Sequence, residues 1–346
     1  MMNPDNPTDG RKAALETWLA GVLAGSPLRI APASADASFR RYFRVWHGSA
    51  TYIAMDAPPG KEDLAPFIEV AAILAEAGVN VPRVLERETG LGFLLLTDLG
   101  SQQYLAALRQ GAEPDALYRD AIAALVRIQA HTLARARRLP LYDAARLRME
   151  MGLFPEWFLG KHLGLELTGK ELALIEEVMT RLTEAALAQP QVLVHRDYHS
   201  RNLMVCDDNP GILDFQDAVR GPSTYDLVSL LKDCYISWPR SHVLEWLDAY
   251  RSAAQAAGVP CGESRSGFIA AFDLMGLQRH LKVLGIFSRL WYRDGKSAYL
   301  ADLPLVLDYT LEAAAGSESM AGLHRFLLER VVPGFAAAQD RALVPA

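Results

Sequence analysis

The chain has 346 residues, of which 51% are hydrophobic and 22% charged, a composition typical of folded globular proteins and not of disordered ones. The formal net charge of −6 argues against a basic nucleic-acid footprint, and no apolar run is long enough to span a membrane. The three cysteines, Cys206, Cys234 and Cys261, form no metal or disulfide pattern, which favours a reducing compartment. The polar N-terminus lacks the apolar segment of a secretory signal. We therefore expect a soluble cytoplasmic protein that binds neither membranes nor nucleic acids; the oligomeric state stays open, and a monomer is compatible with the sequence.

The first part of the chain predicts a helix followed by an antiparallel sheet. Residues 12–25 place Leu15, Leu19 and Val22 on one helical face. An alternating, aromatic-rich run predicts a strand over residues 39–45. Its expected hairpin partner is the run of residues 51–55.

Small residues precede the first of these strands. The backbone N–H groups of a small-residue loop can face the phosphate oxygens of a nucleotide. In this chain Ser and Ala stand where the corresponding loop of a protein kinase has glycines. An ordinary turn would have the same composition, so the assignment depends on the motif farther along the chain. The candidate nucleotide loop comprises Ser34, Ala35, Asp36, Ala37 and Ser38.

A second helix is predicted over residues 62–78, because its apolar residues recur at helical spacing and a glycine follows them. Glu69 lies in the middle of this helix and is either solvated or turned toward a phosphate site. Two further strands are expected over residues 81–85 and 93–96. The pattern then breaks at the Thr-Asp-Leu-Gly sequence of residues 97–100, which we interpret as a hinge between two lobes.

Beyond the hinge the sequence becomes mostly helical. Long amphipathic patterns cover residues 115–132, 141–163 and 168–189, and further helical patterns follow up to residue 331. The expected fold class is therefore α+β. A small N-lobe with an antiparallel sheet would comprise residues 1–97, and a large, mostly helical C-lobe would comprise residues 98–346.

The helical region is interrupted by the stretch VLVHRDYHSRNLMVCDDNPGILDFQD, residues 192–217. An H-R-D triplet ends at Asp197, Asn202 follows five residues later, and Asp214 begins a D-F pair after a second apolar run. This order is the phosphoryl-transfer layout of kinases. The H-x-D-x-x-x-x-N part alone occurs by chance in many chains, but strand, loop, Asn, strand and Asp-Phe in succession are specific.

The spacing of these three residues has a chemical reason. Phosphoryl transfer requires positioning and charge neutralisation more than covalent assistance. Asp197 is the candidate base that accepts the proton of the attacking hydroxyl. Asn202 and Asp214 carry oxygens suited to Mg²⁺, and a hairpin between them would bring the two close together.

Other polar residues of this stretch have supporting or open roles. His195 is expected to be a structural hydrogen-bonding residue that fixes the loop. Arg196 is expected either to orient the loop or to bind a phosphate group. His199 and Arg201 lie in the four-residue gap of the motif and are expected to face substrate or solvent. Asp217 either binds substrate hydroxyls or supports the loop.

Two features after the motif also bear on the site. Asp226 lies in the first turn of a predicted helix, where it either complements the helix dipole or braces the catalytic loop; the nearby motif favours bracing. Arg279 and Lys282 share a later helix. Such cationic residues usually lie at the surface or pack against other residues, but they could line a pocket and bind an anionic group of a substrate.

Six runs together resemble the aminoglycoside phosphotransferase family, a branch of the protein-kinase-like fold. They are ASFRRYFRV, YIAMDAPPG, GFLLLTDLG, HRDYHSRNLMV, GILDFQDAVRGPSTYDLVSLLKDCY and QRHLKVLGIFSRLWYRDGK, and they extend over most of the chain. Within this family the chain is similar to bacterial cell-wall recycling kinases that phosphorylate the anomeric hydroxyl of N-acetylmuramate and N-acetylglucosamine. The resemblance implies a bilobal protein-kinase-like fold, ATP and Mg²⁺ as cofactors, and an amino-sugar α-1-phosphate as the product in peptidoglycan recycling.

Carried over by position, the resemblance also gives roles to residues. Asp197 would be the catalytic base, with Asn202 and Asp214 as magnesium ligands. Residues 34–38 would form the nucleotide loop. The hinge residues beside the adenine would be Leu96, Asp98 and Leu99.

One departure from the family concerns the phosphates. The resemblance implies that Glu69 is the glutamate of the small-lobe helix, whose partner is an ATP-anchoring Lys on the strand of residues 51–55. That strand has no Lys, and Met55 is the approximate counterpart. Arg44 is the candidate replacement for the missing cation.

Two other functions fit parts of the sequence. A kinase of aminoglycosides would require an acidic pocket for a cationic substrate, whereas Arg279 and Lys282 favour a sugar acid if they line the pocket. A non-catalytic nucleotide-binding scaffold is supported only by the missing strand Lys. The presence of Asp197, Asn202 and Asp214 argues against a scaffold, because a scaffold does not require all three.

Overall fold

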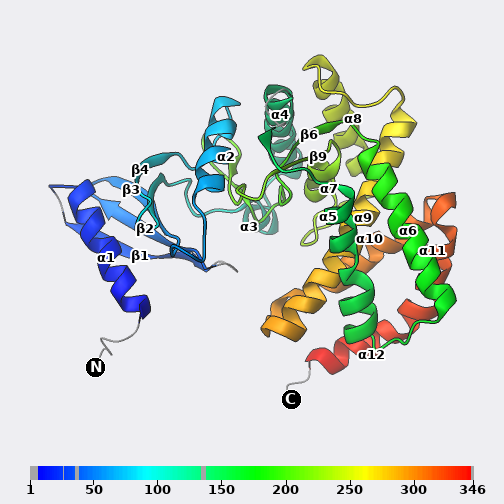
Figure 1. Cartoon of the computed structure of the whole chain (residues 1–346). Coiled ribbons are helices and arrows are strands. Elements are labelled where there is room, and N and C mark those ends of the chain that lie inside the picture. Colours follow the sequence, from blue (N-terminus) through cyan, green and yellow to red (C-terminus); the bar gives the residue numbers. More distant parts are fainter. Residues whose placement is uncertain (1–6, 26, 36–38, 134–137, 344–346) are drawn as a thin grey trace. The chain divides into compact units, whose positions relative to one another are not determined.

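The computed structural model describes residues 7–25, 27–35, 39–133 and 138–343 (Figure 1). Its elements are one antiparallel sheet, two short β-ribbons and many helices, which confirms the predicted α+β class. Among these residues, no helix is both long enough and apolar enough to cross a membrane.

The chain divides into two compact units. Unit 1 comprises Met1–Gln102 and Met204–Asp217, and unit 2 comprises Gln103–Leu203 and Ala218–Ala346. The sequence predicted lobes that meet near residue 97, and that functional boundary stays a prediction. The structure groups the second half of the H-R-D motif stretch with the N-terminal part of the chain.

Unit 1 is built on a five-stranded antiparallel sheet with the order β1-β2-β3-β5-β4. The strands are β1 (Leu28–Ala35), β2 (Arg41–His47), β3 (Ala50–Asp56), β4 (Val84–Glu88) and β5 (Phe93–Thr97). Helix α1 (Pro7–Val22) lies along one face of the sheet (Figure 1). The buried residues of this layer are Leu15, Leu19, Phe43, Val45, Ala54, Phe93 and Leu95.

The alternation of side chains decides what the opposite face of this sheet presents. Phe43 and Val45 of β2 pack with α1, so Arg44, between them, lies on the other face. In β3 the same argument places Met55 on that face, since Ala54 belongs to the α1 layer. Met55 is fully buried, so an apolar side chain shielded from solvent occupies the strand position where the family resemblance implies a Lys.

Helix α2 (Ala65–Glu76) buries Phe67, Val70, Ala71 and Leu74. The helix ends at Glu76, and Gly78, with a φ of 72°, takes the predicted position just after the C-cap residue Ala77. The predicted hairpin is also present: β7 (Leu203–Met204) pairs with β8 (Gly211–Ile212), and the division between the units passes within β7. In unit 1, Ile212 donates its N–H to the Asn80 carbonyl (2.8 Å), which joins this hairpin to the segment after α2.

Unit 2 is helical apart from one ribbon, in which β6 (Gln191–Val194) pairs antiparallel with β9 (Val219–Pro222). The helix α9 (Arg265–Asp294) runs through its core (Figure 1). The other α-helices are α3 (Tyr104–Arg109), α4 (Pro114–Thr132), α5 (Ala144–Met151), α6 (Gly169–Leu187), α7 (Tyr225–Leu231), α8 (Arg240–Ala256), α10 (Leu303–Ala315), α11 (Ala321–Phe326) and α12 (Val332–Leu343).

The helical pattern over residues 141–163 corresponds to two elements. The structure has α5, a break near Gly152, and a π-helix over Phe154–His162. The π-helix packs against α9, where a Cβ atom at Gly285 would come within 2.4 Å of the Leu153 carbonyl carbon. The close approach of two backbones therefore requires glycine at this point of α9.

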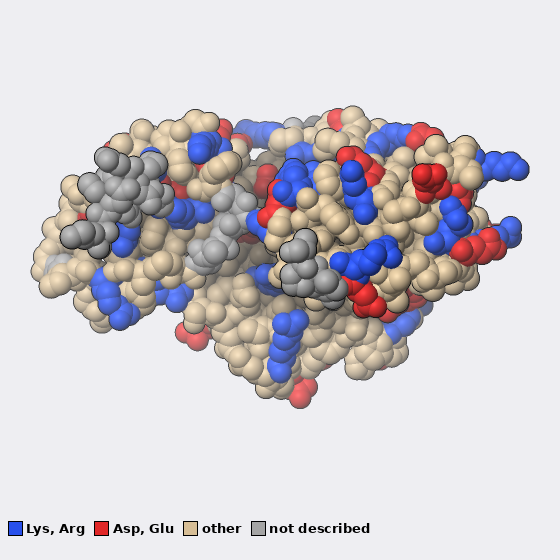
Figure 2. Space-filling view, turned by 90° about the horizontal axis from the view of Figure 1, so that it is seen from below, with Lys and Arg blue, Asp and Glu red and all other residues tan. Residues whose placement is uncertain are grey.

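The surface mixes both charge signs. On the face shown in Figure 2, Lys and Arg side chains are interspersed with Asp and Glu side chains. The sequence contains 35 Lys and Arg residues and 41 Asp and Glu residues.

Candidate active site

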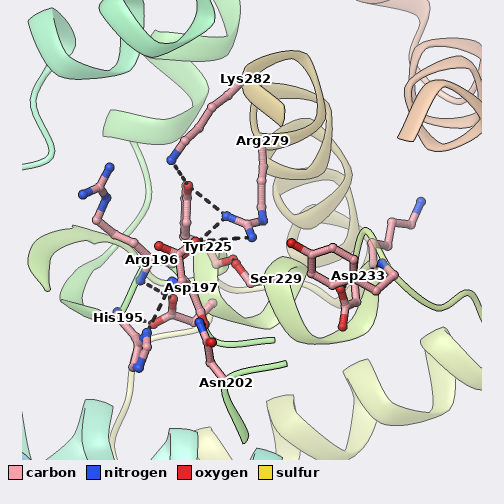
Figure 3. A network of polar contacts seen from close by, with 12 residues as sticks. His195, Arg196, Asp197, Asn202, Tyr225, Ser229, Asp233, Arg279 and Lys282 are labelled. Carbon is pink, nitrogen blue, oxygen red and sulfur yellow. Dashed lines mark hydrogen bonds and ion pairs between the residues drawn. The ribbon is translucent and has the colours of Figure 1, made fainter. Parts of the chain in front are cut away.

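The segment that carries Asp197 follows β6 and is held by a buried carboxylate (Figure 3). Asp226, in the first turn of α7, accepts the backbone N–H of His195 (2.7 Å) and that of Arg196 (2.9 Å). Arg196 has a φ of 79°, in the left-handed region that non-glycine residues rarely adopt. These two contacts are of the kind that the bracing role of Asp226 requires, and they hold a strained turn directly before Asp197; the role in catalysis stays a prediction.

A second carboxylate holds the other end of this loop. Asp233 accepts the backbone N–H of Ser200 at 3.0 Å and also accepts its hydroxyl. The Ser200 carbonyl in turn accepts the N–H of Leu105 at 3.0 Å. Sequence reasoning missed Asp233, which lies just after the end of α7 at Leu231.

Asp197 lies between these two anchors, with its side chain 42% exposed. Partial burial opposes ionisation, but the positive charges of Arg279 and Lys282 outweigh it and lower the pKa of Asp197 to about 2. Arg279 Nη2 lies 3.8 Å from Asp197 Oδ1. The carboxylate is therefore ionised at neutral pH. The Asp197 N–H lies 3.3 Å from His195 Nδ1, a contact that fits the structural role predicted for His195.

The cations beside Asp197 are themselves held by Tyr225 (Figure 3). The Tyr225 hydroxyl accepts from Lys282 Nζ (3.0 Å) and from Arg279 Nη1 (3.2 Å). Arg279 Nη1 also donates to the Arg196 carbonyl at 2.9 Å. Both cations are buried, so they act on Asp197 through fixed positions, and the Arg279–Lys282 region gives no support to the idea of a free anion site in an open pocket.

Glu150 completes this buried network. It pairs with Arg196 Nη2 at 2.6 Å and with Lys282 Nζ at 3.1 Å, and it accepts the Tyr142 hydroxyl. Burial opposes its ionisation, but Lys282 and Arg196 keep the pKa of Glu150 below its ordinary value. No sequence pattern predicted this role, because Glu150 lies on α5, far along the chain from the motif.

Replacing Asp226 with asparagine tests the first anchor. Burial raises the pKa of Asp226 to about 7, while the two backbone donors oppose the rise. Because the unperturbed value is 3.8, this carboxyl contributes a stability that is fully present below pH 3.8 and is lost as the pH rises through about 7. We expect the free energy of unfolding of the wild type to fall, relative to Asp226→Asn, between about pH 4 and 7, the interval between the unfolded and folded pKa values. Urea titrations at several pH values would measure it, and a difference that is constant with pH would contradict the assignment.

The two proposed magnesium ligands lie in different units. In unit 2, Asn202 Nδ2 donates to the Asp197 carbonyl at 3.0 Å, which fixes the carboxamide beside the loop. In unit 1, Asp214 has a φ of 62° and accepts from Gln216 Nε2 at 2.8 Å. Both side chains carry oxygens of the kind that Mg²⁺ prefers, so the donor set fits this ion. Their convergence around one metal ion stays a prediction.

The predicted nucleotide loop is only partly described. Ser34 and Ala35 are the last residues of β1 and pair with Tyr42 and Arg41 of β2, so their backbone is strand and not loop. Asp36, Ala37 and Ser38 lie outside the described residues. The role of the whole segment in nucleotide binding stays a prediction.

Arg44 is bound to the predicted hinge. Its guanidinium pairs with Asp98 (Nε to Oδ2, 2.7 Å) and donates to the Gly100 carbonyl (2.6 Å). Its proposed contact with phosphates stays a prediction that competes with this ion pair. Beside it, Leu96 is buried and the Leu99 carbonyl accepts the Cys206 thiol at 3.2 Å, so the Leu99 carbonyl is already hydrogen-bonded.

The remaining predicted site residues differ in exposure. Glu69 lies on the exposed side of α2, and Asp217 is exposed at the end of unit 1. His199 is buried, with its ring edge toward Tyr235 at 5.4 Å, so it does not face solvent. Arg201 is exposed. The contacts of all four with substrate or nucleotide stay predictions.

Comparison with known proteins decides the family. The model of the phosphotransferase enzyme family matches residues 29–263, which is more than half of the chain. The chain belongs to this family. The H-R-D segment, Asn202 and Asp214 of this phosphotransferase all lie within the matched region.

Curated relatives of this phosphotransferase share nearly its whole length. A protein of Pseudomonas aeruginosa named N-acetylmuramate/N-acetylglucosamine kinase is 49% identical over 92% of this chain and 96% of its own. Proteins of the same name from Pseudomonas putida (48%; 89% of both chains) and Neisseria meningitidis serogroup B (43%; 93% and 96%) are also similar.

Solved structures confirm the bilobal kinase-like fold of this phosphotransferase. The ADP-bound aminoglycoside phosphotransferase APH(2'')-Ib is 15% identical, with a TM-score of 0.56 over 87% of this chain and 98% of that chain. The choline kinase LicA from Streptococcus pneumoniae is 10% identical, with a TM-score of 0.58 over 90% and 99%. At these identities the likeness concerns the fold alone.

Proposed function

We propose that this phosphotransferase transfers the γ-phosphoryl group of ATP to the anomeric hydroxyl of N-acetylmuramate and N-acetylglucosamine. The observation that carries the proposal is the identity of 43% to 49%, over about nine-tenths of the chain, to three proteins named as kinases of these two sugars. The product would be a sugar α-1-phosphate that serves peptidoglycan recycling. A cytoplasmic location is part of the same proposal.

In this mechanism Asp197 orients the anomeric hydroxyl and accepts its proton as the oxygen attacks phosphorus. A pKa near 2 makes Asp197 a weak base. A weak base suffices, because the transition state of phosphoryl transfer is loose and an anomeric hydroxyl is more acidic than an ordinary alcohol. The anchors Asp226 and Asp233 keep Asp197 in place while the proton moves.

Asn202 and Asp214 are the residues that would hold Mg²⁺. When bound, this ion neutralises the charge that develops on the phosphate oxygens. Residues 34–38 and the hinge residues Leu96, Asp98 and Leu99 would hold the nucleotide. The small residues of the loop support this assignment, because they allow backbone N–H groups to approach phosphate oxygens.

The decisive experiment identifies the product. The purified protein is incubated with ATP and Mg²⁺ and, in turn, N-acetylmuramate, N-acetylglucosamine or an aminoglycoside, and ADP release is followed together with the ³¹P spectrum. We expect ADP release with the two amino sugars and a phosphorus signal coupled to the anomeric proton. A phosphorylated aminoglycoside without sugar phosphate, or phosphate on another sugar hydroxyl, would overturn the proposal.

A further inference from the structure

The second half of the loop that follows Asp197 presents one exposed cation. The backbone of Arg201 is fixed, because its carbonyl accepts Gln103 Nε2 at 2.7 Å and the preceding Ser200 is held by Asp233. Its guanidinium lies over the Tyr235 ring, 4.6 Å from the centroid. The charge is thus placed against an aromatic ring, while the side chain as a whole is exposed.

A second arginine approaches the same tyrosine from α3. Arg109 Nη2 lies 3.5 Å from the Tyr235 carbonyl, and Arg109 is exposed like Arg201. Burial raises the pKa of Asp302 to about 6, and Arg201 and Arg109 are the cations that oppose the rise, so both act on this half-buried carboxyl. In unit 2, Arg201 and Arg109 therefore both contact Tyr235, one over its ring and the other at its carbonyl, and the charges of both act on Asp302.

This cluster is close to the candidate base. His199 connects the two, since its N–H donates to the Asp197 carbonyl (3.0 Å) and the centroid of its ring lies 5.4 Å from that of Tyr235. The other cations near Asp197 are engaged in the buried network, in which Arg196 and Lys282 pair with Glu150. Arg201 differs from them because it is both near the loop and exposed.

We infer that Arg201, assisted by Arg109, forms an anion subsite that binds a carboxylate on the acceptor sugar. The inference rests on the proposed function. N-Acetylmuramate carries a lactyl carboxylate on its C3 oxygen, two ring atoms from the reacting C1, and N-acetylglucosamine does not. A subsite for this carboxylate must therefore lie next to the catalytic base and not at the same place. Arg201 and Tyr235 are next to Asp197 in this way. A guanidinium can bind such a carboxylate through two parallel hydrogen bonds.

Replacing Arg201 with methionine tests this subsite, because methionine preserves an unbranched apolar chain over Tyr235 and removes the charge. We expect the ratio of kcat/KM for N-acetylmuramate to kcat/KM for N-acetylglucosamine to fall about 10- to 100-fold, as for the loss of a hydrogen bond to a charged group. Arg201→Glu should lower the ratio further through repulsion, Arg201→Lys should restore part of it, and Arg109→Met should lower it less. Arg181→Met, at an exposed arginine of α6, is the matched control.

The outcomes separate this inference from the proposed function. If the Arg201 variants lower kcat/KM equally for both sugars, the inference is wrong and the sugar-kinase function remains. If the wild-type protein phosphorylates neither sugar, both fail. Circular dichroism before the assays would show whether an equal loss reflects misfolding, and in that case Arg109→Met decides: an unchanged ratio in that variant overturns the subsite.

Discussion

Replacing Asp197 with alanine is expected to lower kcat by about 10²- to 10⁴-fold, the usual contribution of a positioned general base. The side chain lies on a loop held at both ends by buried carboxylates, and Arg279 lies 3.8 Å from it. Its loss would remove the proton acceptor without disturbing the anchors. ADP release under saturating N-acetylmuramate would measure kcat, and a fluorescent nucleotide would measure ATP affinity, which we expect to stay within a few-fold of wild type.

The control for this substitution is Asp308→Ala, at an exposed aspartate of α10. It removes the same group from the same unit at a site outside the loop, and it should retain wild-type turnover. An Asp197→Ala protein that turns over near the wild-type rate would show that the base has been misassigned. Loss of nucleotide binding in that variant would instead place Asp197 in ATP binding.

Replacing Glu150 with leucine is expected to destabilise the protein by about 3 to 5 kcal/mol, the usual cost of removing one partner from a buried ion pair. The substitution leaves Arg196 and Lys282 with buried positive charges and the Tyr142 hydroxyl without its acceptor. Urea unfolding followed by circular dichroism would measure the change. Because the pKa of Glu150 is lowered in the folded protein, its contribution to stability is present at neutral pH. The contribution is lost as the pH falls and Glu150 becomes protonated.

The double variant Glu150→Leu/Lys282→Met shows whether uncompensated charge is the cause. Removing the second charge should recover part of the lost stability. The matched control is Glu177→Leu on α6, since Glu177 forms an exposed pair with Arg181 and should leave the unfolding midpoint almost unchanged. A Glu150→Leu protein as stable as that control would refute the importance of the buried network.

Much of the loop could be predicted from the sequence, because its features are local. The H-R-D triplet, the spacing to Asn202 and the turn before Asp214 can be read from adjacent residues, and Asp226 lies in the first turn of an easily recognised helix. Asp233 was missed, although it holds Ser200 as Asp226 holds His195. An isolated Asp after a helix does not show by itself whether its partner is water or a buried N–H group.

The residues expected to bind the phosphates show a second feature that could not be predicted from the sequence. Met55 could be recognised as the residue in place of a Lys, but only the structure shows that it is fully buried, on the face opposite α1. Arg44 was a reasonable substitute on β2, and the structure reveals that Asp98 and the Gly100 carbonyl bind it. A pairing between residues 54 positions apart depends on the strand register, which the sequence pattern leaves open.

The sequence by itself determined the class and order of the main elements and the chemical identity of the three groups that a kinase requires. The period of the hydrophobic residues, the turn residues and the motif spacing are local properties, so they can be read from the sequence without knowing the fold. The tertiary structure decided which charges are paired and which are exposed. Glu150, Arg196 and Lys282 come from α5, the catalytic loop and α9, and only their packing shows that they neutralise one another while Arg201 remains at the surface. The physical reason is that the electrostatic interaction depends on distance and burial, which are set by how distant segments pack.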